Sequence, residues 1–232
     1  MQKIMLLFAF LFITTGVHSQ AALLVLLLGD KVATENFYFS LKAGANLANL
    51  NGLENTDMRP GAHFGLVTTI KINDKFYLAP EFTPLSRKGA KNIPLAHIDD
   101  APVANELGSP RDIQRVLNYI DIPIVARYYV HERIGLGAGP QFSFLTSAND
   151  SYTTDLADEE VEYSVDIKDD LNPFEFGLVV DITYTAWKAR KGKGLNIHTR
   201  YAHGLTNILK NSSNETLTNS FFQISASFPF VQ

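Results

Sequence analysis

The stretch that decides the fold is residues 116–130, VLNYIDIPIVARYYV. Every second residue from Ile120 to Tyr128 is apolar, whereas the residues between them include Asp121 and Arg127. Successive side chains of a β-strand point to opposite faces, so this alternation predicts a strand with one apolar and one partly polar face. An apolar outer face around a polar interior is typical of a strand that crosses a membrane within a barrel.

The same alternation recurs in seven other segments, with almost no helical pattern to cover their apolar faces. Each segment is about as long as a tilted strand needs to cross a bilayer. The segments are residues 36–47, 61–72, 76–85, 134–146, 173–184, 195–202 and 221–230. Together with residues 116–130 they predict an all-β fold, an eight-stranded antiparallel up-and-down transmembrane β-barrel.

The connections between these segments alternate between long polar loops and shorter turns. The long ones are residues 48–59, 86–115, 147–172 and 206–220, and the shorter ones are residues 73–75, 130–133 and 185–194. Outer-membrane barrels have long loops outside the cell and short turns in the periplasm. The alternation of loop lengths therefore predicts that the barrel lies in the outer membrane, with its long loops facing outward and its short turns facing the periplasm.

Aromatic residues gather at both ends of the predicted strands, as expected for rings that favour the two membrane interfaces. The predicted periplasmic girdle is Phe37, Phe76, Tyr128, Tyr184, Trp187 and Phe230, and the opposite one is Phe64, Phe82, Phe144, Phe174 and Phe222.

Prolines inside the predicted strands do not fit regular strand pairing, because each removes a donor from the hydrogen-bond ladder. We therefore expect bulges or strand ends at Pro80, Pro123, Pro140 and Pro229.

The first residues have the pattern of an export signal. Lys3 precedes an apolar run over residues 4–13, and Val17 and Ser19 fit a cleavage site near Ser19–Gln20. The alternative is a retained membrane helix that continues through residues 21–28, across polar residues 14–20. The predicted organisation is a signal peptide over residues 1–19, an apolar segment over 20–35 and an outer-membrane barrel domain over 36–232.

Composition excludes several classes of site. The 232-residue chain has no cysteine, which rules out disulfides and thiolate metal ligands. A net charge of -4 gives no basic footprint for nucleic acid. His63, His198 and His203 lack the spacing of metal ligands, and the glycines of residues 135–139 lack nucleotide-loop spacing. We therefore predict no metal, no cofactor and no catalytic residue, and interpret those glycines as making room inside the barrel.

Charged residues fall on the faces predicted to line the interior. An eight-stranded barrel is only wide enough to be filled by side chains, and buried charges must pair. The predicted interior charge network is Lys42, Lys71, Glu81, Asp121, Arg127, Glu175, Asp181 and Arg200. Four cations balance four anions, which favours a closed, salt-bridged interior. A proton relay or a ligand site is the alternative.

The third long loop, residues 147–172, is strongly acidic. A solvated, mobile loop is one interpretation, because runs of like charge repel one another. A calcium ion or a basic partner at the cell surface is the other, although no EF-hand pattern is present.

Three runs of the sequence resemble the PorT-type outer-membrane β-barrel family of the Bacteroidota. They are LNYIDIPIVARYY at residues 117–129, FYLAPEF at 76–82 and RYAHGLTNI at 200–208. The resemblance extends over residues 37–230 and implies an eight-stranded barrel. The protein that gives the family its name is tied to gliding and protein secretion.

These patterns predict a small, monomeric outer-membrane barrel that is not an enzyme. A structural, adhesive or secretion-related role is expected, with outer-membrane lipids and envelope or cell-surface proteins as partners. A lipid-modifying enzyme is one alternative, but the loop serines and histidines lack the required spacing. A lipocalin-like secreted binder is another, but it would need an apolar interior.

Overall fold

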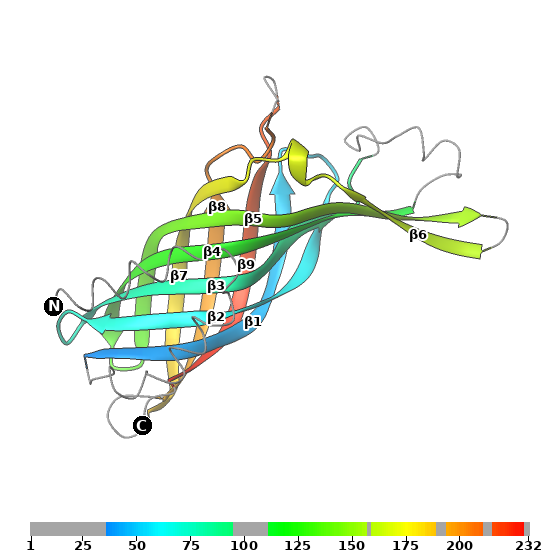
Figure 1. Cartoon of the computed structure of the whole chain (residues 1–232). Helices are drawn as coiled ribbons and strands as arrows, with labels where there is room; N and C mark the ends of the chain where they lie inside the picture. The colour runs from blue at the N-terminus through cyan, green and yellow to red at the C-terminus, as the bar shows by residue number, and fades with distance from the viewer. Residues whose placement is uncertain (1–35, 95–110, 157–158, 189–193, 211–214, 230–232) are drawn as a thin grey trace, which may run out of the picture.

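The structure is a computed structural model that describes residues 36–94, 111–156, 159–188, 194–210 and 215–229 (Figure 1). The predicted signal peptide and the apolar segment of residues 20–35 lie outside the described residues. No helix of the described part is long and apolar enough to cross a membrane. The strands are β1 Phe37–Asn51, β2 Asp57–Lys71, β3 Phe76–Lys91, β4 Arg111–His131, β5 Ile134–Leu156, β6 Glu159–Asp166, β7 Phe174–Lys188, β8 Gly194–Gly204 and β9 Thr218–Pro229.

Eight of these strands close into one antiparallel barrel. Their order is β4-β3-β2-β1-β9-β8-β7-β5, and pairing of β4 with β5 closes the ring. The first and last strands pair directly, with Ala43 opposite Ala226. β6 pairs with β5 and adds to the sheet without entering the ring. The predicted eight-stranded antiparallel barrel is therefore confirmed.

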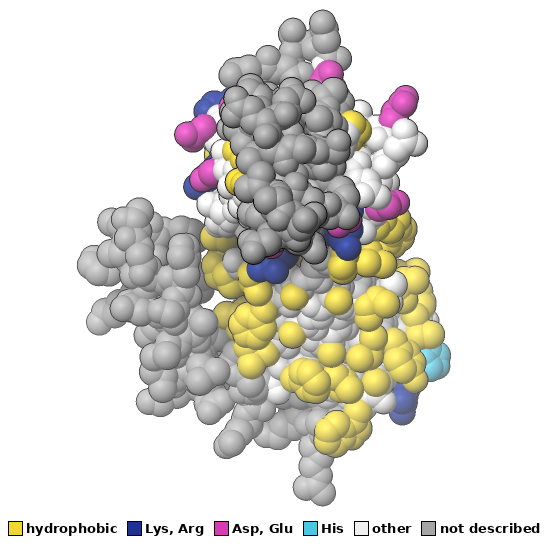
Figure 2. Space-filling model, turned by 90° about the vertical axis from the view of Figure 1, so that its right-hand side faces the viewer, with side chains coloured by type: hydrophobic (Ala, Val, Ile, Leu, Met, Phe, Trp, Pro, Cys, Tyr) yellow, Lys and Arg dark blue, Asp and Glu magenta, His cyan; other side chains and the backbone are white. Residues whose placement is uncertain are grey.

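The outer face of the barrel is apolar, as the alternation predicts. On β7, the side chains of Leu178, Val180 and Ile182 are 50%, 54% and 53% exposed. The residues between them, Val179 and Asp181, are only 1% and 4% exposed. Figure 2 shows the resulting hydrophobic belt below a polar outer region. An exposed apolar surface of this extent suits lipid, because soluble monomers rarely expose such large patches.

Aromatic pairs lie at both edges of this belt. Phe76 and Tyr128, with ring centroids 4.8 Å apart, lie at the end of the short turns. Phe144 and Phe174, 5.5 Å apart, lie at the opposite end. Trp187, near the periplasmic end of β7, is 67% exposed.

The outer ends of β4 and β5 continue well beyond the barrel. The two strands have 21 and 23 residues, about twice the length that crosses a bilayer. β6 pairs with the end of β5 from Asn149↔Asp166 to Leu156↔Glu159, and the three strands form a protruding sheet (Figure 1). The prediction of a loop over residues 147–172 is therefore wrong. On β6 the exposed Glu162 and Asp166 alternate with the half-buried Tyr163 and Val165, so these acidic side chains face water and do not prevent pairing.

Three of the four prolines sit inside strands at positions without a bulge, against expectation. Pro80 pairs with Ile124, Pro123 with Gln141 and Pro140 with Leu178, each without a register shift. A proline removes a single donor, and the bonds on either side hold the register. Only Pro229 lies at a strand end, as predicted.

Two bulges reverse the alternation in the outer half of the barrel. β3 has one extra residue between Thr83 and Ser86, beside Pro84, and β5 has one extra residue at Thr146. A one-residue bulge shifts every later side chain to the other face. Lys88 is consequently buried, although unbroken alternation would place it in lipid.

Candidate functional site

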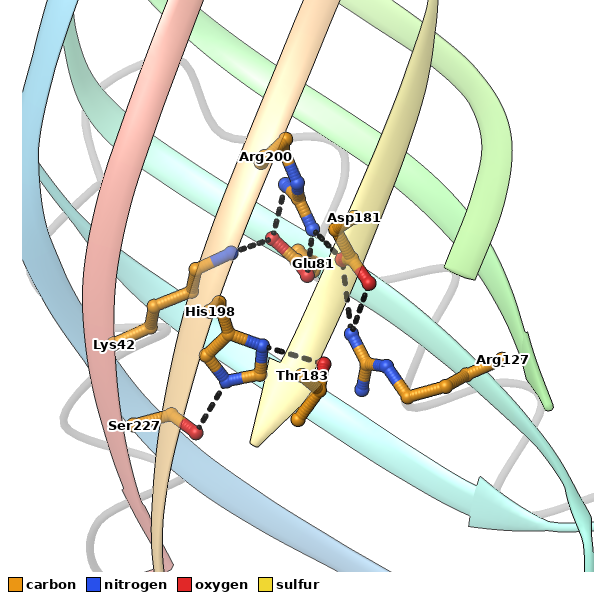
Figure 3. Close-up of polar contacts among 8 residues, drawn as sticks. All are labelled: Lys42, Glu81, Arg127, Asp181, Thr183, His198, Arg200 and Ser227. Carbon is orange, nitrogen blue, oxygen red and sulfur yellow. Dashed lines mark hydrogen bonds and ion pairs between the residues drawn. The ribbon is translucent and has the colours of Figure 1, made fainter. Parts of the chain in front are cut away.

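The centre of the barrel interior holds an ion network built around Arg200 of β8 (Figure 3). Its guanidinium donates Nη1 to Glu81 Oε2 at 2.9 Å and Nη2 to Glu81 Oε1 at 2.6 Å. The same Nη2 donates to Asp181 Oδ2 at 2.8 Å. Glu81 lies on β3 and Asp181 on β7, which are not neighbours in the sheet. Arg200 therefore ties separate parts of the wall together through the interior.

Two further cations extend this network. Lys42 Nζ of β1 donates to Glu81 Oε2 at 2.9 Å. Arg127 Nη2 of β4 donates to Asp181 Oδ2 at 3.0 Å and to Oδ1 at 3.3 Å. No side chain of the five is more than 4% exposed. Because each carboxylate is held by at least two cations, the arrangement fixes these groups in place.

Glycines of β5 make room for this network. A Cβ atom at Gly137 would collide with the Asp181 carboxylate, and one at Gly135 would lie 3.0 Å from Arg127 Cδ. The sequence-based interpretation is confirmed for Gly135 and Gly137, whereas a Cβ atom at Gly139 would collide with the backbone carbonyl of Ile124.

A second interior cluster surrounds Lys88, nearer the outer end. Lys88 Nζ lies 3.0 Å from Asp121 Oδ1 and 3.6 Å from Glu175 Oε2, and donates to Ser143 Oγ at 3.1 Å. The ammonium also lies 4.3 Å from the centre of the Tyr119 ring. Lys88 thus supplies the positive charge for Asp121 and Glu175, the two carboxylates that the central network leaves unpaired.

A separate buried ion pair lies beyond these two clusters, at the outer end of the interior. Arg115 donates Nε to Asp150 Oδ1 at 2.7 Å and Nη2 to Asp150 Oδ2 at 2.6 Å. Both residues are buried, and they face each other across β4 and β5. Asp150 is thus part of the interior and not of a solvated acidic loop. Among the described residues, five buried cations balance five buried anions.

Lys71 does not join the interior network, which corrects the prediction. It lies at the end of β2 with 29% of its side chain exposed, and its Nζ is 2.7 Å from Asp74 Oδ1. The hydrogen bond and the charge of Lys71 hold the pKa of the exposed Asp74 carboxyl below its ordinary value. The strand reaches the short turn at this point, so the inward-facing position opens to water.

Apolar side chains fill the outer end of the interior, which the sequence analysis did not foresee. The connections after β6 and β8 meet at a bridge between Leu171 and Leu209, and Ile208 N donates to Leu217 O at 2.8 Å. Sequence reasoning treated both connections as polar loops. The buried cluster is Leu50, Ala90, Ile93, Ile113, Leu117, Tyr119, Leu145, Ala148, Tyr152, Ile167, Leu171, Ile208 and Leu217.

A small cavity lies between the Lys88 cluster and the wall, beside Gly177 and Gly204. Its volume of ≈ 10 Å³ accommodates about one water molecule. Asn219 is one of the residues that line the cavity. Its side-chain oxygen Oδ1 is buried and has no hydrogen-bond partner within the described residues. A single water bound there would complete the hydrogen bonding of this amide.

The histidines singled out in the sequence lie apart in the structure. His198 contacts Thr183 Oγ1 at 3.0 Å through Nδ1 and Ser227 Oγ at 2.8 Å through Nε2 (Figure 3). His203 stacks on Tyr201, whereas His63 is buried on β2. No group of three or more His, Cys, Asp or Glu side chains that could hold a metal occurs in the described part of the chain.

Comparison with known proteins agrees with the closed barrel and its apolar belt. The family profile described as "Outer membrane protein beta-barrel domain" matches residues 30–210, most of the chain. The chain belongs to this family. It is therefore a small β-barrel of the outer membrane, with the apolar belt facing lipid. A search of curated proteins found no match to this member of the outer membrane protein beta-barrel domain family.

Solved structures of other small outer-membrane proteins are similar to this chain over most of its length. Ail, the attachment invasion locus protein of Yersinia pestis, is 9% identical, with a TM-score of 0.46 over 85% of this chain and 100% of Ail. Neisserial surface protein A is 13% identical, with a TM-score of 0.45 over 83% and 97%. OprG from Pseudomonas aeruginosa is 10% identical, with a TM-score of 0.41 over 85% and 97%. At these values the likeness concerns the fold alone.

Proposed function

We propose that this protein is a closed, monomeric outer-membrane barrel with a structural or adhesive role. The filled interior carries the proposal. Ion pairs occupy the centre and the outer half of the lumen, and the apolar cluster occupies the outer end. An eight-stranded barrel leaves no space for an aqueous channel beside such side chains.

The protruding sheet of β4, β5 and β6 is the feature that favours adhesion. It extends away from the barrel at the end opposite the short turns, where outer-membrane barrels face the surroundings of the cell (Figure 1). Its base is rigid, because Tyr152 and Tyr163 stack with ring centroids 5.6 Å apart and Arg115 binds Asp150. A rigid, exposed sheet suits contact with another surface better than transport.

A lipid-modifying activity is less well supported. The contact of Ser227 with His198 has the spacing of a nucleophile and a base, but both residues are buried in the lumen. The other ring nitrogen of His198 meets the Thr183 hydroxyl and not a carboxylate. A substrate acyl chain outside the barrel has no path to this serine past the filled interior, so we infer that the chain is not an enzyme. A secretion-related role rests only on the resemblance to PorT-type barrels.

Shortening the hairpin should abolish attachment without unfolding the barrel. Tyr152 and Tyr163 are opposite each other in the β5–β6 register, so a two-residue Asn-Gly turn can join them in place of residues 153–162. We expect cells that display this variant to lose most of their attachment to matrix-coated surfaces and to one another. The double variant Asp169→Asn/Asp170→Asn changes exposed charges of the same outer region and leaves the hairpin intact, so it should attach normally.

Each variant must first show the wild-type shift between boiled and unboiled gels and an equal amount at the cell surface. Normal attachment by the shortened variant under those conditions would rule out adhesion through the hairpin.

A further inference from the structure

Two arginines lie on the outer surface just beyond the hydrophobic belt. Arg87 of β3 is exposed and follows Leu85, a belt residue that is 43% exposed, by two positions. A strand rises about 3.3 Å per residue, so Arg87 is roughly 7 Å farther along the strand than Leu85. Arg59 comes from the neighbouring strand β2 and is half-buried. Figure 2 shows Lys and Arg side chains along this upper edge of the belt.

Neutral amides orient both guanidinium groups. Arg59 Nε donates to Gln114 Oε1 at 3.3 Å, and Arg87 Nε donates to Asn118 Oδ1 at 3.4 Å. Gln114 and Asn118 alternate on β4 with the buried Ile113, Arg115 and Leu117, so the amides lie on the outer face. Each amide uses one N–H of its arginine and leaves the charge unneutralised.

No other described residue accepts a hydrogen bond from the remaining donors of the pair. Neither Arg59 nor Arg87 forms an ion pair with a carboxylate of the described residues, and the two charges are near enough to repel each other. Arg59 Nη1 is buried without any hydrogen-bond partner in the same set of residues. A buried charged donor without a partner is costly, so the pair is incomplete without an anion.

We propose that Arg59 and Arg87 bind the phosphate of an anionic lipid headgroup in the outer leaflet. The planar fork of a guanidinium donates two parallel hydrogen bonds to phosphate, and each arginine presents one such fork on the outer surface. The position selects the lipid as the source, because Leu85 next to the pair contacts the acyl region while Arg87 lies where headgroups begin. Lys91 of β3 is also exposed, but no amide side chain among the described residues orients its ammonium group.

Electron paramagnetic resonance of spin-labelled lipids can test this site. The full barrel is folded into phosphatidylcholine vesicles that contain spin-labelled phosphatidic acid or spin-labelled phosphatidylcholine. The ratio of the two motionally restricted fractions gives the relative association constant. We expect wild type to prefer phosphatidic acid, and each of Arg59→Gln and Arg87→Gln to reduce that preference by roughly fivefold. The pair Arg59→Lys/Arg87→Lys keeps the charge and loses the fork, so it should fall between wild type and the double glutamine variant.

The matched control is Lys91→Gln/Lys168→Gln, which removes two exposed charges of the outer region and leaves the arginines in place. It should retain the wild-type preference. The proposal fails if Arg59→Gln/Arg87→Gln, folded by the unboiled-gel shift, keeps the full preference. It also fails if the lysine control loses as much, which would indicate diffuse charge attraction. Loss of the wild-type preference on adding millimolar inorganic phosphate would instead identify a site for the free anion.

Discussion

The substitution Glu81→Gln should destabilise the folded barrel by about 3–5 kcal/mol, the cost of removing one partner from a buried ion pair. Glu81 is the carboxylate that Lys42 and Arg200 share, and its side chain is 1% exposed. Glutamine keeps the shape but leaves three buried cations, Lys42, Arg127 and Arg200, with the single carboxylate of Asp181. Equilibrium folding into lipid vesicles against urea measures the change.

Two further variants identify the cause of the effect. Lys71→Gln breaks an ion pair at the exposed rim and should change the stability little, because exposed pairs are weak. Adding Lys42→Met to Glu81→Gln removes one of the stranded cations and should restore part of the loss. A Glu81→Gln barrel as stable as wild type would show that the network does not hold the interior together.

The substitution Val180→Arg should cost roughly 2–4 kcal/mol, the penalty for a cation that faces lipid near the bilayer midplane. Val180 lies near the middle of β7 and is 54% exposed. Trp187→Arg is the matched control, because it introduces the same residue on an exposed site of the same strand near the interface. The penalty falls to about 0–1 kcal/mol there. Equal costs at the two positions would mean that the middle of β7 does not face hydrocarbon.

Alternation along the sequence was sufficient to predict the ring of strands and most of its inner face. On β4 it correctly separates Asp121 and Arg127 from the belt, and on β7 it separates Asp181 from Val180. The alternation is informative because every strand of a closed barrel has one face in contact with lipid and the other in contact with the packed interior. The position of a residue in the alternation then determines which face it occupies, as long as no bulge interrupts the strand.

The parts of the site that sequence reasoning missed lie beyond the two bulges. Lys88 and Asp150 enter the interior only because β3 and β5 each gain a residue upstream of them. Pro84 lies at the bulge of β3, but Pro80, Pro123 and Pro140 lie in register, so proline alone does not locate a bulge. Thr146 offered no comparable signal. Long-range pairing of Arg115 with Asp150 is also invisible to a local pattern.

The apolar outer end was missed for a different reason. Leu171 and Leu217 each stand between polar residues, and Ile208 has only Leu209 beside it, so no strand or helix period marks these positions. Only the folded barrel shows that these positions meet at the outer end of the interior. Apolar residues inside otherwise polar loops of a barrel are a signal that the loop folds back onto the interior.

The measurement that tests the central claim most directly is the conductance of the purified full chain in a planar lipid bilayer. The filled lumen predicts no stable current steps above the baseline of the bilayer, although the protein is inserted and resists unfolding on unboiled gels. Among the described residues, ion networks and apolar side chains fill the centre and the outer end of the lumen, so we expect no continuous water path through eight strands. Steady, porin-like steps from wild-type protein would contradict a closed barrel and the structural or adhesive role proposed for it.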